Sequence, residues 1–441
     1  MAIADELAKL ETNRANIVAA INSKGGELAE NAGLAACPEA ISQLSSAGGT
    51  TLWTGHVDEA GLRYIGWNDE DIANLKANIC WDEEDDELYA VPQDHKDLWD
   101  ACEKVEVNGR TMIAYRELSK WKAIDFYLRY LPMVDTSAAN GSRLFSEMVW
   151  LYAIPNIDAS GFTSLSGIFR VCVNLLYIPN LVAPNVTNAE SFAEGCKKLL
   201  TCYLSGTSSV TNMQNMFSGC SFLREVPLLD TSSVTNMQNM FYGCSSLREV
   251  PLLDTSSVTN MQGMFYGCSS LREVPQFNTS RCKTIFQIFD RSVLVDFRLN
   301  MATIIDCNQI FNQCKWLLRA HFTFTSLMTG AQNWFINPRN ITEMSFADTC
   351  SLAGVKSANN MFANSTSNSI PKGCVNYILV KQVCEMMLRG VPAYSAASYP
   401  MYFESGSAVT DDAAGTLQSL VEQCQAMGWA IYNLTINPYT E

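Results

Sequence analysis

The sequence has few charged residues, and the two signs are unequal. Asp, Glu, Lys and Arg make up 17% of the 441 residues, and 45 acidic against 30 basic residues leave a formal net charge of -15. Proteins bind nucleic acid largely through Lys and Arg that neutralise phosphates. This balance therefore argues against nucleic acid and against an anionic membrane surface as partners.

Long apolar runs are also missing. No run approaches the roughly 20 residues that a membrane-spanning helix needs. The first residues carry charges where a signal peptide would be apolar, at Asp5, Glu6, Lys9, Glu11 and Arg14. We therefore expect no signal peptide and no membrane insertion, and a chain that stays in the cytoplasm where it is made unless lysis releases it. Hydrophobic residues reach 48%, so the chain should fold.

Signals for catalysis or metal binding are sparse. The three histidines, His56, His95 and His321, lie in unrelated segments, and no C-x-x-C pair occurs among the 16 cysteines. The acidic run 82–87 could bind calcium, but it lacks the spacing of an EF-hand loop, so a solvated or partner-facing patch is the favoured interpretation. We predict no catalytic residue, cofactor or metal ligand. Two carboxylates that hydrolyse glycans need no motif and stay an open alternative.

Internal repetition dominates the sequence. Residues 207–230 and 231–254 differ only at Tyr242 and Ser246, and a third copy starts at Thr255. Phenylalanines continue the period at intervals of 22 to 27 residues, at Phe145, Phe169, Phe192, Phe217, Phe241, Phe265, Phe289, Phe311, Phe335 and Phe362. The cysteines keep step, at Cys172, Cys196, Cys220, Cys244 and Cys268, with Ser292 next in register. The period predicts a stack of about ten units whose thiols are reduced and buried.

Each unit has two parts. Val234, Met237, Met240, Phe241 and Cys244 follow the spacing of an amphipathic helix, with residues 230–232 as its cap and Gly243 near its end. Residues 247–252 then match a short strand in which alternate side chains point inward. The prediction is an α/β leucine-rich-repeat-type solenoid with one helix and one strand per coil.

On the strand face, charges recur at fixed register. Stacked strands would bring like charges next to one another, which is tolerable if the rows offset one another or stay solvated, and is otherwise a recognition surface. As a candidate binding strip we take the glutamates, the arginines and three apolar neighbours, namely Glu225, Glu249, Glu273, Arg224, Arg248, Arg272, Leu229, Leu253 and Phe277.

The repeat string TSSVTNMxxMFYGCSSLxEV resembles that of BspA-like leucine-rich-repeat proteins of bacterial surfaces. The N-terminal string MAIADELAKLETNRANIVAAINSKGGE, followed by ACPEAISQL, resembles the start of fibre proteins of tailed bacteriophages, including crAss-like phages. In this segment Leu7 and Ile21 take position a of a short heptad, and Ile3, Leu10 and Ile17 take position d. Leu at a with Ile at d favours three or four strands, although an ordinary helix that packs on its own domain is equally compatible.

We predict four regions. They are an N-terminal helical oligomerisation and attachment segment at 1–48, a small Trp-rich α+β domain at 49–140, the solenoid at 141–365 and a C-terminal α+β cap at 366–441. Within the cap we expect a strand at 375–380, a helix at about 413–427 and a strand at 429–436.

Together these features predict a non-enzymatic virion protein, a head or tail fibre or decoration protein. We expect a homotrimer that attaches to other virion proteins and presents its solenoid to a host-surface protein or glycan. Two alternatives stay open. One is a host-encoded, leaderless adhesin or effector that binds protein or glycan, and the other is a fibre-borne glycan hydrolase.

Overall fold

The computed structural model describes residues 56–57, 59–77, 88–89, 91, 93–123, 128–298, 300–314, 316–330, 335–336, 341–355, 370, 374–390 and 399–440. The chain divides into two compact units, Met1–Ala101 and Cys102–Glu441. The division falls inside the region 49–140 that we predicted as one domain. The predicted N-terminal helix, with Ile3, Leu7, Leu10, Ile17 and Ile21, lies outside the described residues, as does the acidic run 82–87.

The first unit is α+β in its described part. It contains β1 (His56–Val57), α3 (Glu59–Tyr64), α4 (Asp69–Ala77), β2 (Leu88–Tyr89) and α5 (Gln93–Ala101), with β1 and β2 parallel. Asn68 caps α4 reciprocally with Asp71, since each side chain accepts the backbone N–H of the other. Its core contains buried Leu62, Trp67 and Trp99.

The second unit begins with a hairpin of β3 (Lys104–Val107) and β4 (Arg110–Ile113). Asn108 and Gly109 form its turn with φ angles of 51° and 73°, as a two-residue turn of the primed type requires. A short 3₁₀ turn, η2 (Tyr115–Glu117), and α6 (Leu118–Ala123) follow. A parallel bridge from Ile113 to Val134 then joins the hairpin to the start of the solenoid.

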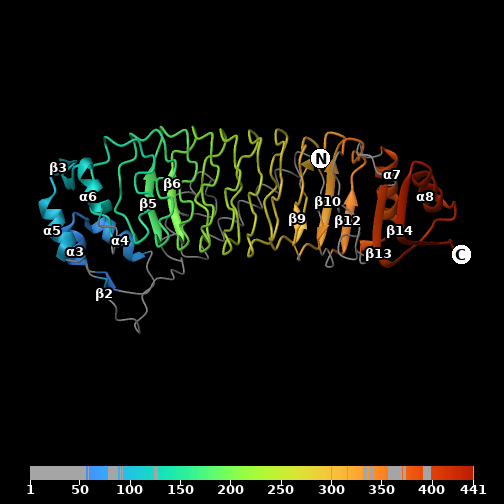
Figure 1. Ribbon diagram of the computed structural model, residues 1–441, viewed down its shortest axis with the longest axis horizontal. Coiled ribbons are helices and arrows are strands. Elements are labelled where there is room, and N and C mark those ends of the chain that lie inside the picture. Colours follow the sequence, from blue (N-terminus) through green and yellow to red (C-terminus); the bar gives the residue numbers. More distant parts are fainter. Residues whose placement is uncertain are drawn as a thin grey trace, which may run out of the picture. The chain divides into compact units, whose positions relative to one another are not determined.

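The solenoid stacks coils side by side, from green to orange in Figure 1. A row of parallel bridges joins eight successive coils, through Ser164, Asn188, Asn212, Asn236, Asn260, Thr284, Asp306 and Gly330. The prediction of a repeat solenoid is confirmed. Of the later predicted repeats, Phe335 is described through its backbone, in β11 (Phe335–Ile336), and Phe362 lies outside the described residues.

The helix predicted in each coil is wrong. No helix occurs in the described residues between 128 and 355; the segment 234–244 is a run of turns. Its N–H groups alternate: Asn239 and Phe241 donate to the next coil, at 2.8 and 3.0 Å, whereas Tyr242 donates to the carbonyl three residues back. In an α-helix each N–H beyond the first turn donates to the carbonyl four residues back. Left-handed φ angles at Asn239 (54°) and Gly243 (71°) also break it.

The apolar stripe that suggested a helix does form the interior. Val234, Met237, Met240, Phe241 and Cys244 are all fully buried. The phenylalanines stack into one column, with ring centroids 5.5 to 6.0 Å apart from Phe145 through Phe289. Each coil therefore packs the same side chain against its copy, and coils stabilise one another rather than forming separate cores.

Polar interior groups bridge neighbouring coils. The thiol of Cys244 donates to the carbonyl of Phe217 at 3.1 Å, and that of Cys268 donates to Phe241 at 3.1 Å. Ser292, which takes the same register, donates from its hydroxyl to Phe265. All five repeat cysteines are buried, as predicted. Burial raises the pKa of the Cys196, Cys220 and Cys244 thiols well above the ordinary value.

The second part of each coil, which we call the arm, is residues 247–254 and their equivalents. Arms pair as parallel strands near the two ends of the solenoid. Near the start β5 (Tyr177–Val182) pairs with β6 (Thr201–Ser205). Near the other end β10 (Arg319–Phe324) pairs with β7 (Asp296–Phe297), β8 (Asn300–Met301) and β12 (Glu343–Phe346). Outside the arms, in the segment that carries the phenylalanine column, β9 (Phe311–Asn312) pairs with β11.

The C-terminal region is α+β. It contains α7 (Tyr377–Leu388), β13 (Tyr399–Thr410), α8 (Thr416–Ala426) and β14 (Trp429–Asn437), with β13 and β14 parallel. A helix was expected at about 413–427 and a strand at 429–436, where the structure has α8 and β14, and Asp411 accepts two N–H groups of the first turn of α8. The strand predicted at 375–380 is wrong, because Asn376 caps α7 there by accepting the N–H of Leu379.

Candidate binding face

The predicted charges lie on the arms of the near-identical coils. Glu225, Glu249 and Glu273 are exposed, and so are Arg248 and Arg272, whereas Arg224 is half-buried. In the described chain none of Arg248, Glu249, Arg272 and Glu273 forms an ion pair or a side-chain hydrogen bond. The two rows therefore stay solvated, and like charges follow one another along the solenoid.

These arms do not pair into a sheet. No backbone hydrogen bond joins residues 248–253 to the neighbouring arms in the described chain, although the same coils are hydrogen-bonded throughout their turn segments. A proline column at Pro227, Pro251 and Pro275 removes one donor from each arm. Paired arms would also bring like charges directly opposite one another, which is destabilising.

Where the signs alternate, the arms do pair. Arg319 on β10 lies opposite Asp296 on β7 and opposite Glu343 on β12. Its Nε lies 2.9 Å from Asp296 Oδ2. Burial alone would raise the pKa of Asp296, but hydrogen bonds from Arg298 and Arg319 outweigh it and lower that pKa. Between β7, β10 and β12, alternating charge thus accompanies strand pairing.

The apolar members of the predicted strip lie inside the solenoid. Leu229, Leu253 and Phe277 are 6%, 3% and 6% exposed, so they pack on the interior column instead of the surface. The preceding residues take the surface positions, with Leu228 and Leu252 at 77% and 73% exposed. In two of these arms a proline precedes two consecutive leucines, as at Pro227, Leu228 and Leu229. The proline disturbs the alternation of inward and outward side chains, so the sequence does not show which leucine points inward.

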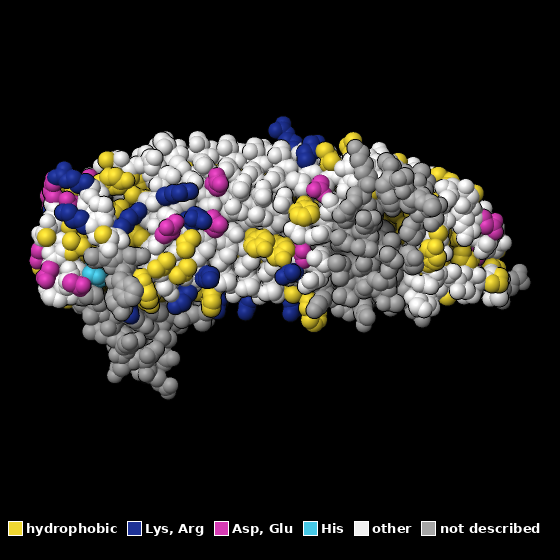
Figure 2. Space-filling model, viewed as in Figure 1, with side chains coloured by type: hydrophobic (Ala, Val, Ile, Leu, Met, Phe, Trp, Pro, Cys, Tyr) yellow, Lys and Arg dark blue, Asp and Glu magenta, His cyan; other side chains and the backbone are white. Residues whose placement is uncertain are grey.

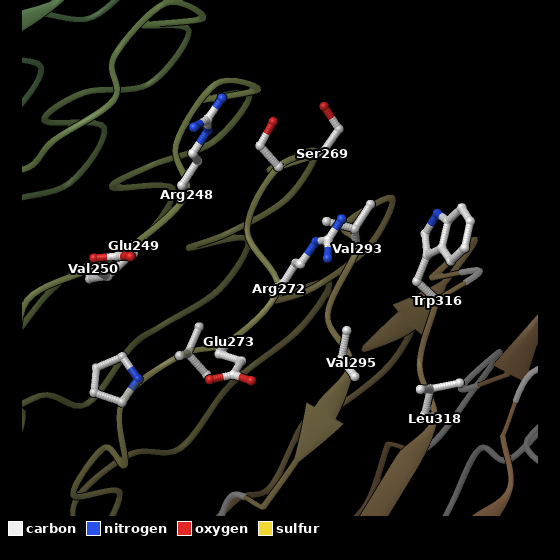
Figure 3. Close-up of a pocket in the computed structure, with 13 residues that line it drawn as sticks. Arg248, Glu249, Val250, Ser269, Arg272, Glu273, Val293, Val295, Trp316 and Leu318 are labelled. Atoms are coloured by element: carbon white, nitrogen blue, oxygen red, sulfur yellow. The ribbon is translucent and has the colours of Figure 1, made fainter. Parts of the chain in front are cut away.

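A groove lies over the unpaired arms and continues onto the neighbouring arms that carry β7 and β10 (Figure 3). It has a volume of about 1440 Å³ and crosses four successive coils. Its lining combines the four unpaired charges with the apolar side chains of Val250, Val274, Val295 and Leu318, and with Trp316, which is 62% exposed. Trp316 was missed by the sequence analysis. Its position within the repeat could have revealed it, because Trp316 directly precedes an interior leucine, as Phe222 does in an earlier coil.

A smaller hollow of about 350 Å³ continues from the same residues, since both are lined by Glu273, Val274 and Pro275. It reaches the paired charges Asp296, Arg298 and Arg319. Elsewhere, much of the solenoid surface in Figure 2 is neither charged nor hydrophobic. The groove therefore concentrates unpaired charge and exposed aromatic surface on a largely neutral scaffold.

Two histidines have described side chains, and one of them, His321, has a polar side chain near each ring nitrogen. His321 Nδ1 lies 2.6 Å from the hydroxyl of Ser345, and its Nε2 lies 3.5 Å from Glu343. These residues face one another across paired strands β10 and β12. The next two N–H groups are already engaged, since Phe346 donates to Gln382 and Ala347 donates to Phe322. These two N–H groups are therefore not available to hold an oxyanion.

Among the described residues no three His, Cys, Asp or Glu side chains converge as a metal site would require. No described helix has the length and apolar character needed to cross a membrane.

The fold defines a repeat solenoid that carries a charged groove on its unpaired arms. Residues 189–301 match the family described as "Mycoplasma protein of unknown function, DUF285". This match is compatible with a BspA-like leucine-rich-repeat protein. No curated protein and no solved structure matches the chain.

Proposed function

We propose that this chain is a non-enzymatic structural protein of a phage particle, a fibre or decoration protein of head or tail, whose solenoid presents a binding surface for host-cell attachment. The observation that carries the binding part is the groove over the unpaired arms, where the side chains of Arg248, Glu249, Arg272 and Glu273 form no ion pair or hydrogen bond in the described chain. An exposed tryptophan near arginine side chains is typical of a recognition surface.

The solenoid suits a projecting role. Its coils are joined by backbone hydrogen bonds at the turn segments and by a continuous phenylalanine column, so the solenoid should be rigid along its length. Its conspicuous residues recur once per coil, as stacking requires, whereas catalysis needs a unique set. This contrast supports a binding and spacing role over an enzymatic one.

The remaining assignments come from the sequence. Residues 1–48 would form the oligomerisation and attachment segment, through Ile3, Leu7, Leu10, Ile17 and Ile21, and would assemble a homotrimer onto other virion proteins. Residues 366–441 would cap the last coil. In support, Phe346 on β12 donates its N–H to Gln382 on α7, and Arg389 donates to the carbonyl of Cys350.

The test is to locate the protein. Purified particles from the producing host should contain the chain by mass spectrometry, and antibody against residues 207–278 should label their exterior in electron micrographs. A chain abundant in host cells or medium but absent from purified particles would overturn the virion assignment and favour the leaderless adhesin. Turnover of a capsule polysaccharide by the purified chain would overturn the non-enzymatic assignment.

A further inference from the structure

The groove over the unpaired arms offers hydrogen-bonding groups of both kinds. The Arg248 and Arg272 guanidinium groups can only donate, and the Glu249 and Glu273 carboxylates can only accept when ionised. The backbone of residues 248–253 adds donors and acceptors that no neighbouring arm uses in the described chain. A ligand that satisfies this surface must offer donors and acceptors together at both coils that carry an Arg–Glu pair.

Charge narrows the ligand class. Two guanidinium groups and two carboxylates give the groove no net charge, and neither sign has an advantage along its length. A nucleic acid or another polyanion would meet the glutamates as often as the arginines. A polycation would meet the arginines just as often. The groove therefore fits a neutral ligand.

The distance between successive coils narrows the ligand class further. The Arg–Glu pair recurs in two adjacent coils of the groove, and coils joined by parallel bridges stack at about 4.8 Å. An extended peptide advances by only about 3.3 Å per residue, so successive residues would fall out of register with successive coils. A polysaccharide suits both members of each Arg–Glu pair, because each of its hydroxyl groups both donates and accepts.

The end of the groove provides an aromatic contact. Trp316 is 62% exposed and lies at one end of the lining, on the far side of Arg272 from Arg248 (Figure 3). An exposed indole ring offers a flat apolar surface on which the C–H face of a sugar ring can pack. The floor residues Val274 and Val295 suit the same apolar face.

We propose that the groove binds a neutral linear polysaccharide laid along the solenoid axis, with its hydroxyl groups on the two Arg–Glu pairs and a terminal sugar packed on Trp316. This inference rests on the proposed role of the solenoid as a binding surface and names its ligand. The arginines would donate to hydroxyl oxygens, and the glutamates would accept from hydroxyl groups in the same coil.

The test uses the full chain and isothermal titration calorimetry. The probes are neutral oligosaccharides from β-glucan, mannan and galactan, graded by length, together with a uronic-acid oligosaccharide and an extended peptide of alternating Lys and Glu. At least one neutral series should bind, and its affinity should rise with length and level off once the four coils are filled. Trp316→Ala should lower that affinity at least tenfold, as should Arg272→Ala with Glu273→Ala.

The matched control is Tyr439→Ala, which removes another half-exposed aromatic side chain, near the C-terminus. It should leave binding unchanged, and circular dichroism should show all variants folded. The inference fails if no neutral series binds, if only the uronate or the peptide binds, or if folded Trp316→Ala binds as the unaltered chain does. A chain found in particles that binds no neutral glycan overturns this inference alone. A glycan-binding chain absent from particles overturns only the virion assignment.

Discussion

Exchanging the two charges of one central arm should stabilise the solenoid. In the natural sequence Arg248 follows Arg224 and precedes Arg272, and Glu249 lies in the same way between two glutamates. The double variant Arg248→Glu, Glu249→Arg converts these four like-charge neighbours into four opposite-charge neighbours. It reproduces the order seen at Arg319, which lies between Asp296 and Glu343 on paired strands.

The expected magnitude follows from the number of neighbours. An opposite-charge pair across strands contributes roughly 0.2–1 kcal/mol, and exposed pairs fall at the lower end. Four such changes should increase the free energy of unfolding by about 1–2 kcal/mol. Screening should remove most of the gain when the Debye length falls from about 30 Å at 0.01 M salt to about 3 Å at 1 M.

Urea unfolding followed by circular dichroism at the two salt concentrations measures the effect. Arg319→Glu is the inverse control, because it creates like-charge neighbours with Asp296 and Glu343 and should destabilise the protein. Equal or lower stability of the double variant at low salt would refute the explanation that like charges help to keep the central arms unpaired.

Three further predictions concern the interior, the backbone and assembly. The thiols of the repeat column should resist a thiol reagent in the native state, because they are buried and burial raises the pKa of Cys196, Cys220 and Cys244. Rapid labelling of the native protein, measured by mass spectrometry, would contradict this. Asn239→Val should lower the free energy of unfolding by about 1–3 kcal/mol because a β-branched residue is strained at a φ of 54°. Asn239→Gly should change the free energy of unfolding little, since Gly263 occupies the equivalent position of the next coil with a φ of 59°. Equal thermal stability of the two variants would show that the left-handed backbone at residue 239 does not limit the side chain there. Deleting residues 1–45 should lower the mass measured by light scattering from an oligomer to a monomer, whereas a full-length chain that is monomeric at micromolar concentration would exclude the coiled-coil interpretation.

The interior of the solenoid was predictable from period alone. A constant interval places Phe217, Phe241 and Phe265 at equivalent points of successive coils, and stacking then requires them to meet. The same reasoning placed Cys244 in a buried column. Neither conclusion needs the conformation of the chain between the repeating residues.

That conformation is where the sequence analysis failed. Apolar residues three and four apart are compatible with a helix, but a run of turns whose alternate N–H groups bond to the next coil satisfies the same spacing. The distinguishing sign was the pair Asn239 and Gly243, four residues apart, because both residue types tolerate left-handed backbone. At 375–380 the β-branched residues suggested a strand, yet Asn376 begins a helix there.

The candidate site was partly predictable. The charges recur with the period, so Arg248, Glu249 and their equivalents were expected on the arm surface. The groove was not, because it depends on the failure of the arms to pair and on Trp316, which a later, degenerate coil supplies. Sequence alone also could not choose between Leu228 and Leu229 for the interior, since Pro227 disturbs the alternation of the arm.

The central claim is that the solenoid is a binding and spacing device carried on the particle by the N-terminal region. Deleting the single coil 231–254 tests it most directly, because coils 207–230 and 255–278 present nearly the same contacts to each other at the new junction. The measurement is the amount of the shortened chain in purified particles relative to the intact chain, with circular dichroism to show that it is folded. The account predicts equal incorporation. Loss of a folded, shortened chain from the particles would contradict it, because the solenoid would then be the attachment site itself.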